Sequence, residues 1–227
     1  AHRLRGRMSS VVIPSRDLCF LHVPKTAGAA ISTALRETFP DAVAHPARAL
    51  DETAPGAATW LAEAIGPDAL RRLRTFCVVR NPWDWMVSAY AFLTRTCRAY
   101  GDTPPDFAWF VTGAGADGAC RNPYPEKFAT ARAAIRYHAH LPQHAHLSVH
   151  GRPAEVTRIL RFERLDQDLA DLIRDFDLPE IAVPHLNRSP RGDYRRYYDD
   201  ALQRTVARIN APLIARFGHR FDPIEGD

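Results

Sequence analysis

The hydrophobic residues of the chain fall into short apolar runs that alternate with longer amphipathic stretches. The short runs predict buried strands at 17–23, 75–79 and 155–162. Helical spacing predicts helices at 29–39, 83–100, 125–137, 165–176 and 199–217, with further helical segments in 51–74 that break near Gly66 and Pro67. Strands that alternate with helices predict an α/β fold, with a mostly parallel sheet covered on both faces.

Length and composition are those of one globular domain. The chain has 227 residues, of which 46% are hydrophobic and 25% charged. We expect residues 17–227 to form a single domain and residues 1–16 to be an N-terminal extension. Met8 is a candidate natural start, and the residues before it are then either left over from cloning or an upstream extension. No apolar run reaches the ~20 residues of a membrane span and no signal-peptide pattern is present, so we expect a cytoplasmic protein. The oligomeric state stays open.

The charge pattern suits a small anionic ligand better than a nucleic acid. The formal net charge is only +4 with 30 Lys and Arg residues, and arginine predominates among them. The basic residues are dispersed rather than arranged in a stripe, which argues against a nucleic-acid partner. Arginine forks readily onto phosphate and sulfate oxygens. The four cysteines show no metal-binding spacing, and we expect free thiols, with a Cys97–Cys120 disulfide as the alternative.

A first candidate anion site joins the strand at 17–23 to the helix that follows it. The connecting segment is Val23-Pro24-Lys25-Thr26-Ala27-Gly28. Free N–H groups and the helix dipole favour an anion at such a junction, and Gly28 allows a close backbone approach. The loop is not a Walker A motif, because its lysine precedes the glycine. Taken alone, it is equally compatible with a surface turn.

A second candidate anion site follows the strand at 75–79. Arg80 ends an apolar run, where a lone charge is costly unless it has an anionic partner. Ser88, on the next helix, could offer a hydroxyl group to the same anion. The structural alternative is an Arg80–Asp84 ion pair. Together, the two sites at neighbouring strand ends fit one ligand that carries two separated phosphate groups.

These segments resemble the sulfotransferases that use 3′-phosphoadenosine 5′-phosphosulfate (PAPS), especially the branch with heparan-sulfate 2-O- and 6-O-sulfotransferases and bacterial relatives. His22 to Gly28 resembles the 5′-phosphosulfate loop of that family, and Val79 to Tyr90 resembles its 3′-phosphate motif. Further similar stretches follow in the order of the family, and the resemblance spans roughly residues 17–222. These stretches are Leu141-Pro142-Gln143, Arg161-Phe162-Glu163-Arg164-Leu165, Leu186-Asn187-Arg188-Ser189, and Tyr194 with Tyr197-Tyr198.

The resemblance implies a P-loop-NTPase-like three-layer αβα fold and a role for each matching residue. Lys25 would stabilise the leaving oxygen of the product, adenosine 3′,5′-bisphosphate (PAP), and no metal is required. The other donor-site residues implied are Thr26, Ala27, Gly28, Ala29 and Ala30 for the 5′-phosphate, Arg80 and Ser88 for the 3′-phosphate, and Arg188, Ser189 and Tyr194 in a covering segment. The chain departs from the family at Ala27, where a second glycine is usual, and at Ala29 and Ala30, where hydroxyl residues are common. Backbone N–H groups must therefore carry more of the phosphate binding.

The acceptor side is less well defined. His45, in a segment that follows the first helix and resembles the region of the family's catalytic base, is the first candidate for that role, with Asp51 and Glu52 as alternatives. The histidine-rich run 137–146 could line the acceptor site through His140 and His144, bind a metal, or simply lie at the surface. Trp109 could form an acceptor wall.

Other functions share the same architecture. A nucleotide or small-molecule kinase is one alternative, although the lysine–glycine order and the missing acidic Mg²⁺ ligand argue against it. A non-catalytic PAPS- or PAP-binding protein is another. For the sulfotransferase, we expect a bacterial enzyme that sulfates a hydroxyl or amine of a carbohydrate or natural product.

Overall fold

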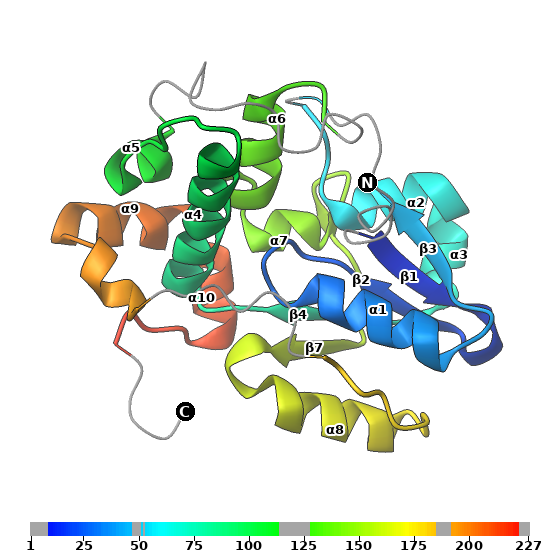
Figure 1. The fold of residues 1–227 in the computed structure, drawn as a ribbon. Coiled ribbons are helices and arrows are strands. Elements are labelled where there is room, and N and C mark those ends of the chain that lie inside the picture. Colours follow the sequence, from blue (N-terminus) through cyan, green and yellow to red (C-terminus); the bar gives the residue numbers. More distant parts are fainter. Residues whose placement is uncertain (1–8, 47–50, 52, 114–127, 185–191, 223–227) are drawn as a thin grey trace. The chain divides into compact units, whose positions relative to one another are not determined.

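The computed structural model describes residues 9–46, 51, 53–113, 128–184 and 192–222 (Figure 1). The chain divides into two compact units, each of which is described by itself. Unit 1 comprises residues 1–47, 55–80 and 145–188, and unit 2 comprises residues 48–54, 81–144 and 189–227. None of the helices in the described ranges is long and apolar enough to cross a membrane.

Unit 1 is built on a sheet of five strands in the order β3-β1-β2-β4-β7. Strands β2, β4 and β7 are parallel neighbours, and β1 runs antiparallel to both β2 and β3. Four strands therefore share one direction and β1 alone is reversed, which confirms the predicted mostly parallel sheet. The strands are β1 (Ser9–Ile13), β2 (Leu18–Leu21), β3 (Val43–Pro46), β4 (Arg74–Val79) and β7 (Arg158–Arg161), and a separate hairpin pairs β5 (Ser148–Val149) with β6 (Arg152–Pro153).

Helices cover both faces of this sheet. The chain passes from β2 through α1 (Gly28–Thr38) to β3 on one side, and from β3 through α2 (Ala57–Ile65) and α3 (Pro67–Arg72) to β4 on the other. Because such crossovers are right-handed, connections that run in opposite directions place their helices on opposite faces. α8 (Leu165–Asp175) packs with α1 against the core residues Phe20, Phe76 and Leu160. The α/β class with three layers is confirmed.

Unit 2 is helical and packs around α4 (Pro82–Ala99). α4 contacts α5 (Phe107–Thr112), α9 (Asp200–Ile209), the 3-10 turn η5 (Tyr194–Tyr197) and the π-helical turn η3 (Arg136–His140). Its core holds the fully buried Trp85, Met86 and Val87 of α4 and Phe110 of α5. The remaining helical elements of the chain are α6 (Ala131–Ile135), α7 (Gln143–His146), α10 (Ala211–Phe217), η2 (Pro14–Arg16) and η4 (Phe162–Arg164).

Two expectations about the elements need correction. Ser9–Ile13, assigned above to an extension, is a buried strand of the sheet. His45 does follow the first helix as expected, and it lies there in strand β3, an edge strand that is too short and too exposed to show a strand pattern. The predicted helix at 199–217 is two helices, because Asn210 ends α9 and Pro212 in the first turn of α10 cannot donate the hydrogen bond that would continue it.

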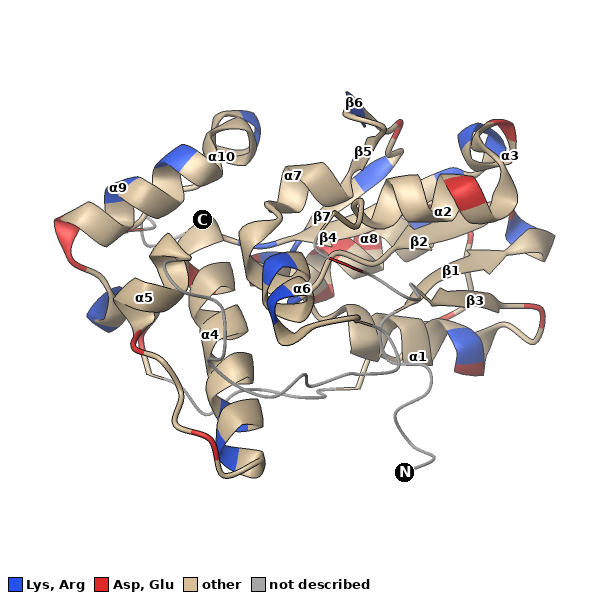
Figure 2. Cartoon of the chain, turned by 90° about the horizontal axis from the view of Figure 1, so that it is seen from above, with Lys and Arg blue, Asp and Glu red and all other residues tan. Residues whose placement is uncertain are grey.

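Basic and acidic residues are spread over several helices rather than gathered in one stripe, as Figure 2 shows. Arginines occur on α1, α3, α9 and α10, at Arg36, Arg71, Arg72, Arg204, Arg208 and Arg216. The absence of a nucleic-acid partner stays a prediction.

Candidate functional site

The connections of the sheet mark one pair of strand ends in unit 1. From β2 the chain continues through α1 towards β3 on one side, and from β4 it continues eventually to β7 on the other side. β2 and β4 are parallel neighbours, so their carboxyl ends form the topological switch point, which is where open α/β sheets bind ligands. The loop after β2 and Arg80 after β4 are the two segments that were predicted to bind anions. We call residues 22–28 the first junction and residues 80–82 the second junction.

The backbone of the first junction has an unusual conformation. Lys25 has φ 66° and Ala27 has φ 65°, so two non-glycine residues adopt the left-handed conformation on either side of Thr26. Thr26 is fully buried and its hydroxyl donates to Val23 O over 2.9 Å, which closes the turn. Left-handed residues in such a turn direct successive N–H groups into one concavity, the arrangement known as an anion-binding nest. Position 27, where glycine is usual in the family that this chain resembles, thus has a backbone conformation that favours glycine. Ala27 adopts this left-handed conformation at a cost of about 1 kcal/mol.

The N-terminus of α1 opens from this loop without a side-chain cap. Ala27 is its N-cap residue and forms no side-chain cap, and the first turn holds no acidic residue. Ala30 and Ile31 donate to Ala27 O, whereas the N–H groups that begin a helix have no acceptor within it. Among the residues that the structure describes, no side chain caps these first-turn donors, so the turn presents backbone N–H groups and a positive dipole end.

Gly28 is needed here because a histidine ring lies against it. A Cβ atom at position 28 would stand 2.1 Å from Cδ2 and 2.3 Å from Nε2 of His22. The His22 ring is 7% exposed and stacks on Phe20, with 6.0 Å between the ring centroids. The His22 backbone N–H donates to Ser10 Oγ, which ties the junction to β1. The sequence motif included His22 but gave no hint of this contact.

Arg80 reaches the first junction from the end of β4. Its side chain is 6% exposed, and Nη1 donates to Lys25 O over 3.1 Å. The guanidinium carbon lies 3.8 Å from the centroid of the Phe162 ring. The structure therefore brings together three of the segments that carried the family resemblance: the first loop, Arg80, and the stretch 161–165.

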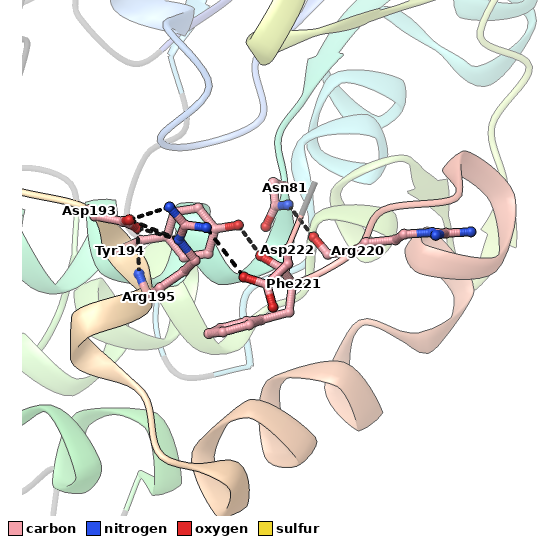
Figure 3. A network of polar contacts seen from close by, with 7 residues as sticks. All are labelled: Asn81, Asp193, Tyr194, Arg195, Arg220, Phe221 and Asp222. Atoms are coloured by element: carbon pink, nitrogen blue, oxygen red, sulfur yellow. Dashed lines mark hydrogen bonds and ion pairs between the residues drawn. The ribbon is translucent and has the colours of Figure 1, made fainter. Parts of the chain in front are cut away.

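The second junction leads into a helix that is capped by its own chain. The Asn81 side chain accepts from Trp83 N over 3.1 Å and from Asp84 N over 3.4 Å, and Pro82 occupies the first helical position. Asn81 Nδ2 also donates to Arg220 O (Figure 3). The backbone N–H groups of Trp83 and Asp84 in the first turn of α4 thus donate to the Asn81 side chain. An anion near this junction must therefore be recognised by side chains.

Tyr194, expected in the covering segment, uses its hydroxyl within unit 2. It donates to Phe221 O, and its ring meets the Phe221 ring edge-on (Figure 3). Trp83 and Tyr198 also meet Phe221 edge-on, and Tyr198 donates to Trp83 O over 2.8 Å. Burial, followed by the nearby Asp84 carboxylate, raises the pKa of Tyr194 to about 12. The hydroxyl proton of Tyr194 is therefore used by Phe221 O, which leaves the acceptor side of that oxygen and the ring for contact with a ligand.

A cluster of charges continues this network at the surface. Arg195 bonds to Asp193 and to Asp222 (Figure 3). Asp193 also accepts from Arg195 N and so caps the turn η5. Arg195 thus links η5 to the segment after α10. The predicted residues Arg188 and Ser189 lie outside the described residues, as does Cys120.

His45 lies on the same edge of the sheet as the first junction. It pairs with Ser10 of β1 near the carboxyl end of β3, and β1 in turn pairs with β2. Two inter-strand spacings place β3 on the order of 10 Å from β2. Burial lowers the pKa of His45, which favours the neutral imidazole that a general base requires. The alternative Asp51 accepts from Thr53, which keeps its pKa low and makes it a weaker base, and Glu52 lies outside the described residues.

The remaining predicted residues belong to unit 2. Ser88 lies in α4 and is 6% exposed. Trp109 is half-buried in α5, whose N-terminus is capped by Asp106. Because these residues and the first junction are in different units, Ser88 as a 3′-phosphate ligand and Trp109 as an acceptor wall stay predictions.

The histidine-rich run includes most of the π-helical turn η3 and all of α7. His138, which is buried, lies 2.7 Å from Ala134 O through Nδ1, and His140 lies 2.6 Å from Phe110 O through Nε2. Burial lowers the pKa of both His140 and His144. Within the described residues, no group of three or more His, Cys, Asp or Glu side chains could hold a metal ion. Within this run, His138 and His140 each place a ring nitrogen at hydrogen-bond distance from a backbone carbonyl.

Comparisons with known proteins find little. No family model matches the chain, and no curated protein matches it. The crystal structure of a sulfotransferase from Alicyclobacillus acidocaldarius is similar at 20% sequence identity over 74% of this chain, with a TM-score of 0.37. The match covers 61% of that chain, so this chain spans less than two thirds of its length. A similarity this weak assigns neither family nor function.

Proposed function

We propose that this protein is a sulfotransferase that moves the sulfuryl group of PAPS to an acceptor hydroxyl or amine. The observation that carries the proposal is the first junction: a nest with left-handed Lys25 and Ala27, an uncapped helix N-terminus, and Arg80 bonded to the same loop, all at the switch point. The order of the motifs along the sequence, described above, adds the identity of the ligand.

The first junction would bind the 5′-phosphosulfate end of the donor. Backbone N–H groups of Thr26 to Ala30 would hold the 5′-phosphate, because the side chains of Ala27, Ala29 and Ala30 offer no donor. Arg80 would contact the 3′-phosphate by a charge-assisted hydrogen bond, with Ser88 as its partner and Arg188, Ser189 and Tyr194 over the nucleotide.

Transfer follows from this placement. The acceptor oxygen forms a bond to sulfur while the bond from sulfur to the bridging oxygen breaks, and PAP leaves with the electron pair. Lys25 would neutralise the charge that develops on the bridging oxygen. His45 would take the proton of an acceptor hydroxyl, since its imidazole is held neutral by burial. The protein would contribute mainly position and charge stabilisation, and we propose that no metal is required.

The acceptor would be bound by histidine and aromatic side chains. His140 and His144 in η3 and α7, with Trp109 in α5, are the residues proposed to meet the acceptor. We propose a carbohydrate or a small natural product as acceptor, in a bacterial cytoplasm, on the basis of the sequence resemblance alone.

The test is a calorimetric titration with PAP in the absence of magnesium. The wild type should bind PAP, and Arg80→Ala should weaken binding on the order of tenfold to a hundredfold, because it removes a charge-assisted contact of about 1.5–3 kcal/mol. Arg158→Ala is the matched control, since Arg158 begins the neighbouring strand at the opposite edge and pairs with Asp175. Binding of ATP with Mg²⁺ but not of PAP would replace the proposal with the kinase alternative. Tight PAP binding without transfer to any acceptor would leave a non-catalytic PAP-binding protein.

A further inference from the structure

An aromatic ring lies directly under the buried arginine of the second junction. β4 and β7 are parallel neighbours, and their register pairs Val79 with Arg161. This pair ends both strands, and the residues that follow it directly, Arg80 and Phe162, lie beside each other. The guanidinium carbon of Arg80 lies 3.8 Å from the Phe162 ring centroid, within the range of a cation–π contact.

This stacking holds the guanidinium group without using its hydrogen-bond donors. A guanidinium group carries five N–H donors in its plane, and an aromatic face below that plane competes for none of them. One donor, on Nη1, bonds to Lys25 O over 3.1 Å. The ring and this bond together fix both the plane of the group and its rotation within that plane.

A ring is better suited to this position than an aliphatic side chain of similar size. Arg80 is 6% exposed, and a charge that is this deeply buried is costly without compensation. The negative face of an aromatic ring attracts a cation, whereas leucine would only fill the space. Phe162 itself is half-buried against the core of unit 1, so the ring has little freedom to move away.

We infer that Phe162 is a positioning residue that orients the Arg80 guanidinium group towards the 3′-phosphate of PAP. This inference rests on the proposed function. Phe162 need not touch the phosphate, because it acts by holding Arg80 at one tilt while Lys25 O holds one of its edges. The first junction, Arg80 and Phe162 then form one connected group of residues in unit 1.

The experiment compares two nucleotides that differ by the 3′-phosphate. PAP and adenosine 5′-monophosphate are titrated calorimetrically into the wild type, Phe162→Leu and Phe162→Tyr. Phe162→Leu should weaken PAP binding by about threefold to thirtyfold, the range of a cation–π contact, and adenosine 5′-monophosphate binding by less than about twofold. Phe162→Tyr should retain the wild-type affinities, since it keeps the ring.

A second arginine–aromatic pair provides the matched control. Arg74 stacks over Phe176 at 4.8 Å, in the same unit but at the beginning of β4, away from the switch point. Phe176→Leu should leave both affinities unchanged. In an Arg80→Ala background, Phe162→Leu should have no further effect on PAP, because the group that it orients is gone.

The outcomes separate the inference from the proposed function. Wild-type affinity for PAP in Phe162→Leu, or equal losses for both nucleotides, would overturn the inference and leave the sulfotransferase proposal intact. A wild type that binds no PAP would overturn both. If Phe162→Leu fails to fold, pentafluorophenylalanine at position 162 keeps the shape of the ring and reverses its quadrupole, and the same selective loss for PAP is expected.

Discussion

The first and second junctions both connect a strand to a helix, and they differ in whether the N-terminus of that helix is capped by a side chain. In the first, α1 begins at Ala27 with no side-chain cap and no acidic residue in its first turn. In the second, Asn81 caps α4, and Asp84 lies in its first turn. A capped and acidic helix start satisfies its own donors and opposes an anion, whereas an uncapped one attracts it. Similar strand–turn–helix segments can therefore recognise an anion in two ways, through the backbone at one and through an arginine side chain at the other.

Because of this difference, we expect different kinds of substitution to weaken PAP binding at the two junctions. The first junction depends on backbone conformation and on the space around Gly28, and the second on the single guanidinium group of Arg80. Side-chain truncation should thus be tolerated at Ala27 and Ala29 but not at Arg80. Added atoms should be harmful at Gly28.

The largest effect is expected at His45, the base that we propose for the reaction at the first junction. His45→Gln should lower kcat about a hundredfold or more, the usual contribution of general base catalysis. Because burial lowers the pKa of His45 below its ordinary value of about 6.5, the wild type should keep its kcat/KM down to that pH and lose it as the pH falls further through the lowered pKa. A pH profile of kcat/KM, measured with the acceptor well below its KM and with saturating PAPS, checks this. An acid limb that persists in His45→Gln would assign the base elsewhere.

The next effect tests the steric requirement of the first junction. Gly28→Ala should abolish measurable PAP binding or weaken it at least tenfold, because its Cβ would overlap the His22 ring, and overpacking of this kind also costs about 1–3 kcal/mol of stability. Calorimetry and thermal unfolding measure the two effects. Gly192→Ala is the control, since among the described residues a Cβ there meets only Arg196 Nη1, at 4.0 Å. Adding His22→Ala to Gly28→Ala should restore part of the binding, and no recovery would contradict the proposed clash.

A smaller effect distinguishes the cap of the second junction from a ligand. Asn81→Ala removes a helix cap and a hydrogen bond to Arg220 O, which should lower the free energy of unfolding by about 1–2 kcal/mol. Urea unfolding measures this change. PAP affinity should change by less than about threefold, in contrast to Arg80→Ala. A loss of PAP affinity as large as that of Arg80→Ala would show that Asn81 also binds the ligand.

The smallest expected effect is a gain in stability rather than a loss. Ala27→Gly should raise the free energy of unfolding by up to about 1 kcal/mol, because φ 65° is strained for alanine and free for glycine. Ala29→Gly, two residues later in the first turn of α1, should instead lower stability by a similar amount, since helical φ gives glycine no advantage. Chemical unfolding of both variants gives the comparison. Equal signs would mean that the left-handed conformation at Ala27 carries no strain.

Local patterns in the sequence were sufficient for much of the fold. Leu18–Leu21 and Arg74–Val79 are strands because each is an apolar run bounded by polar or turn residues, and α1 and α4 follow from helical spacing after a loop. The helix predicted at 199–217 was too long, because the apolar register continues across Asn210 while Pro212 interrupts the hydrogen bonds. β3 escaped prediction because an edge strand that is only half-buried shows no apolar run.

The sequence by itself determined that a lysine, a glycine and a helix start are neighbours along the chain, and this predicted a candidate anion-binding loop. Only the tertiary structure decided what supports that loop. The parallel register of β4 and β7 sets Phe162 beneath Arg80, although the two residues are 82 positions apart in the sequence. The turn after β2 places the His22 ring against Gly28. Such contacts depend on strand order and on one-residue register, which residue types along a single chain do not encode locally.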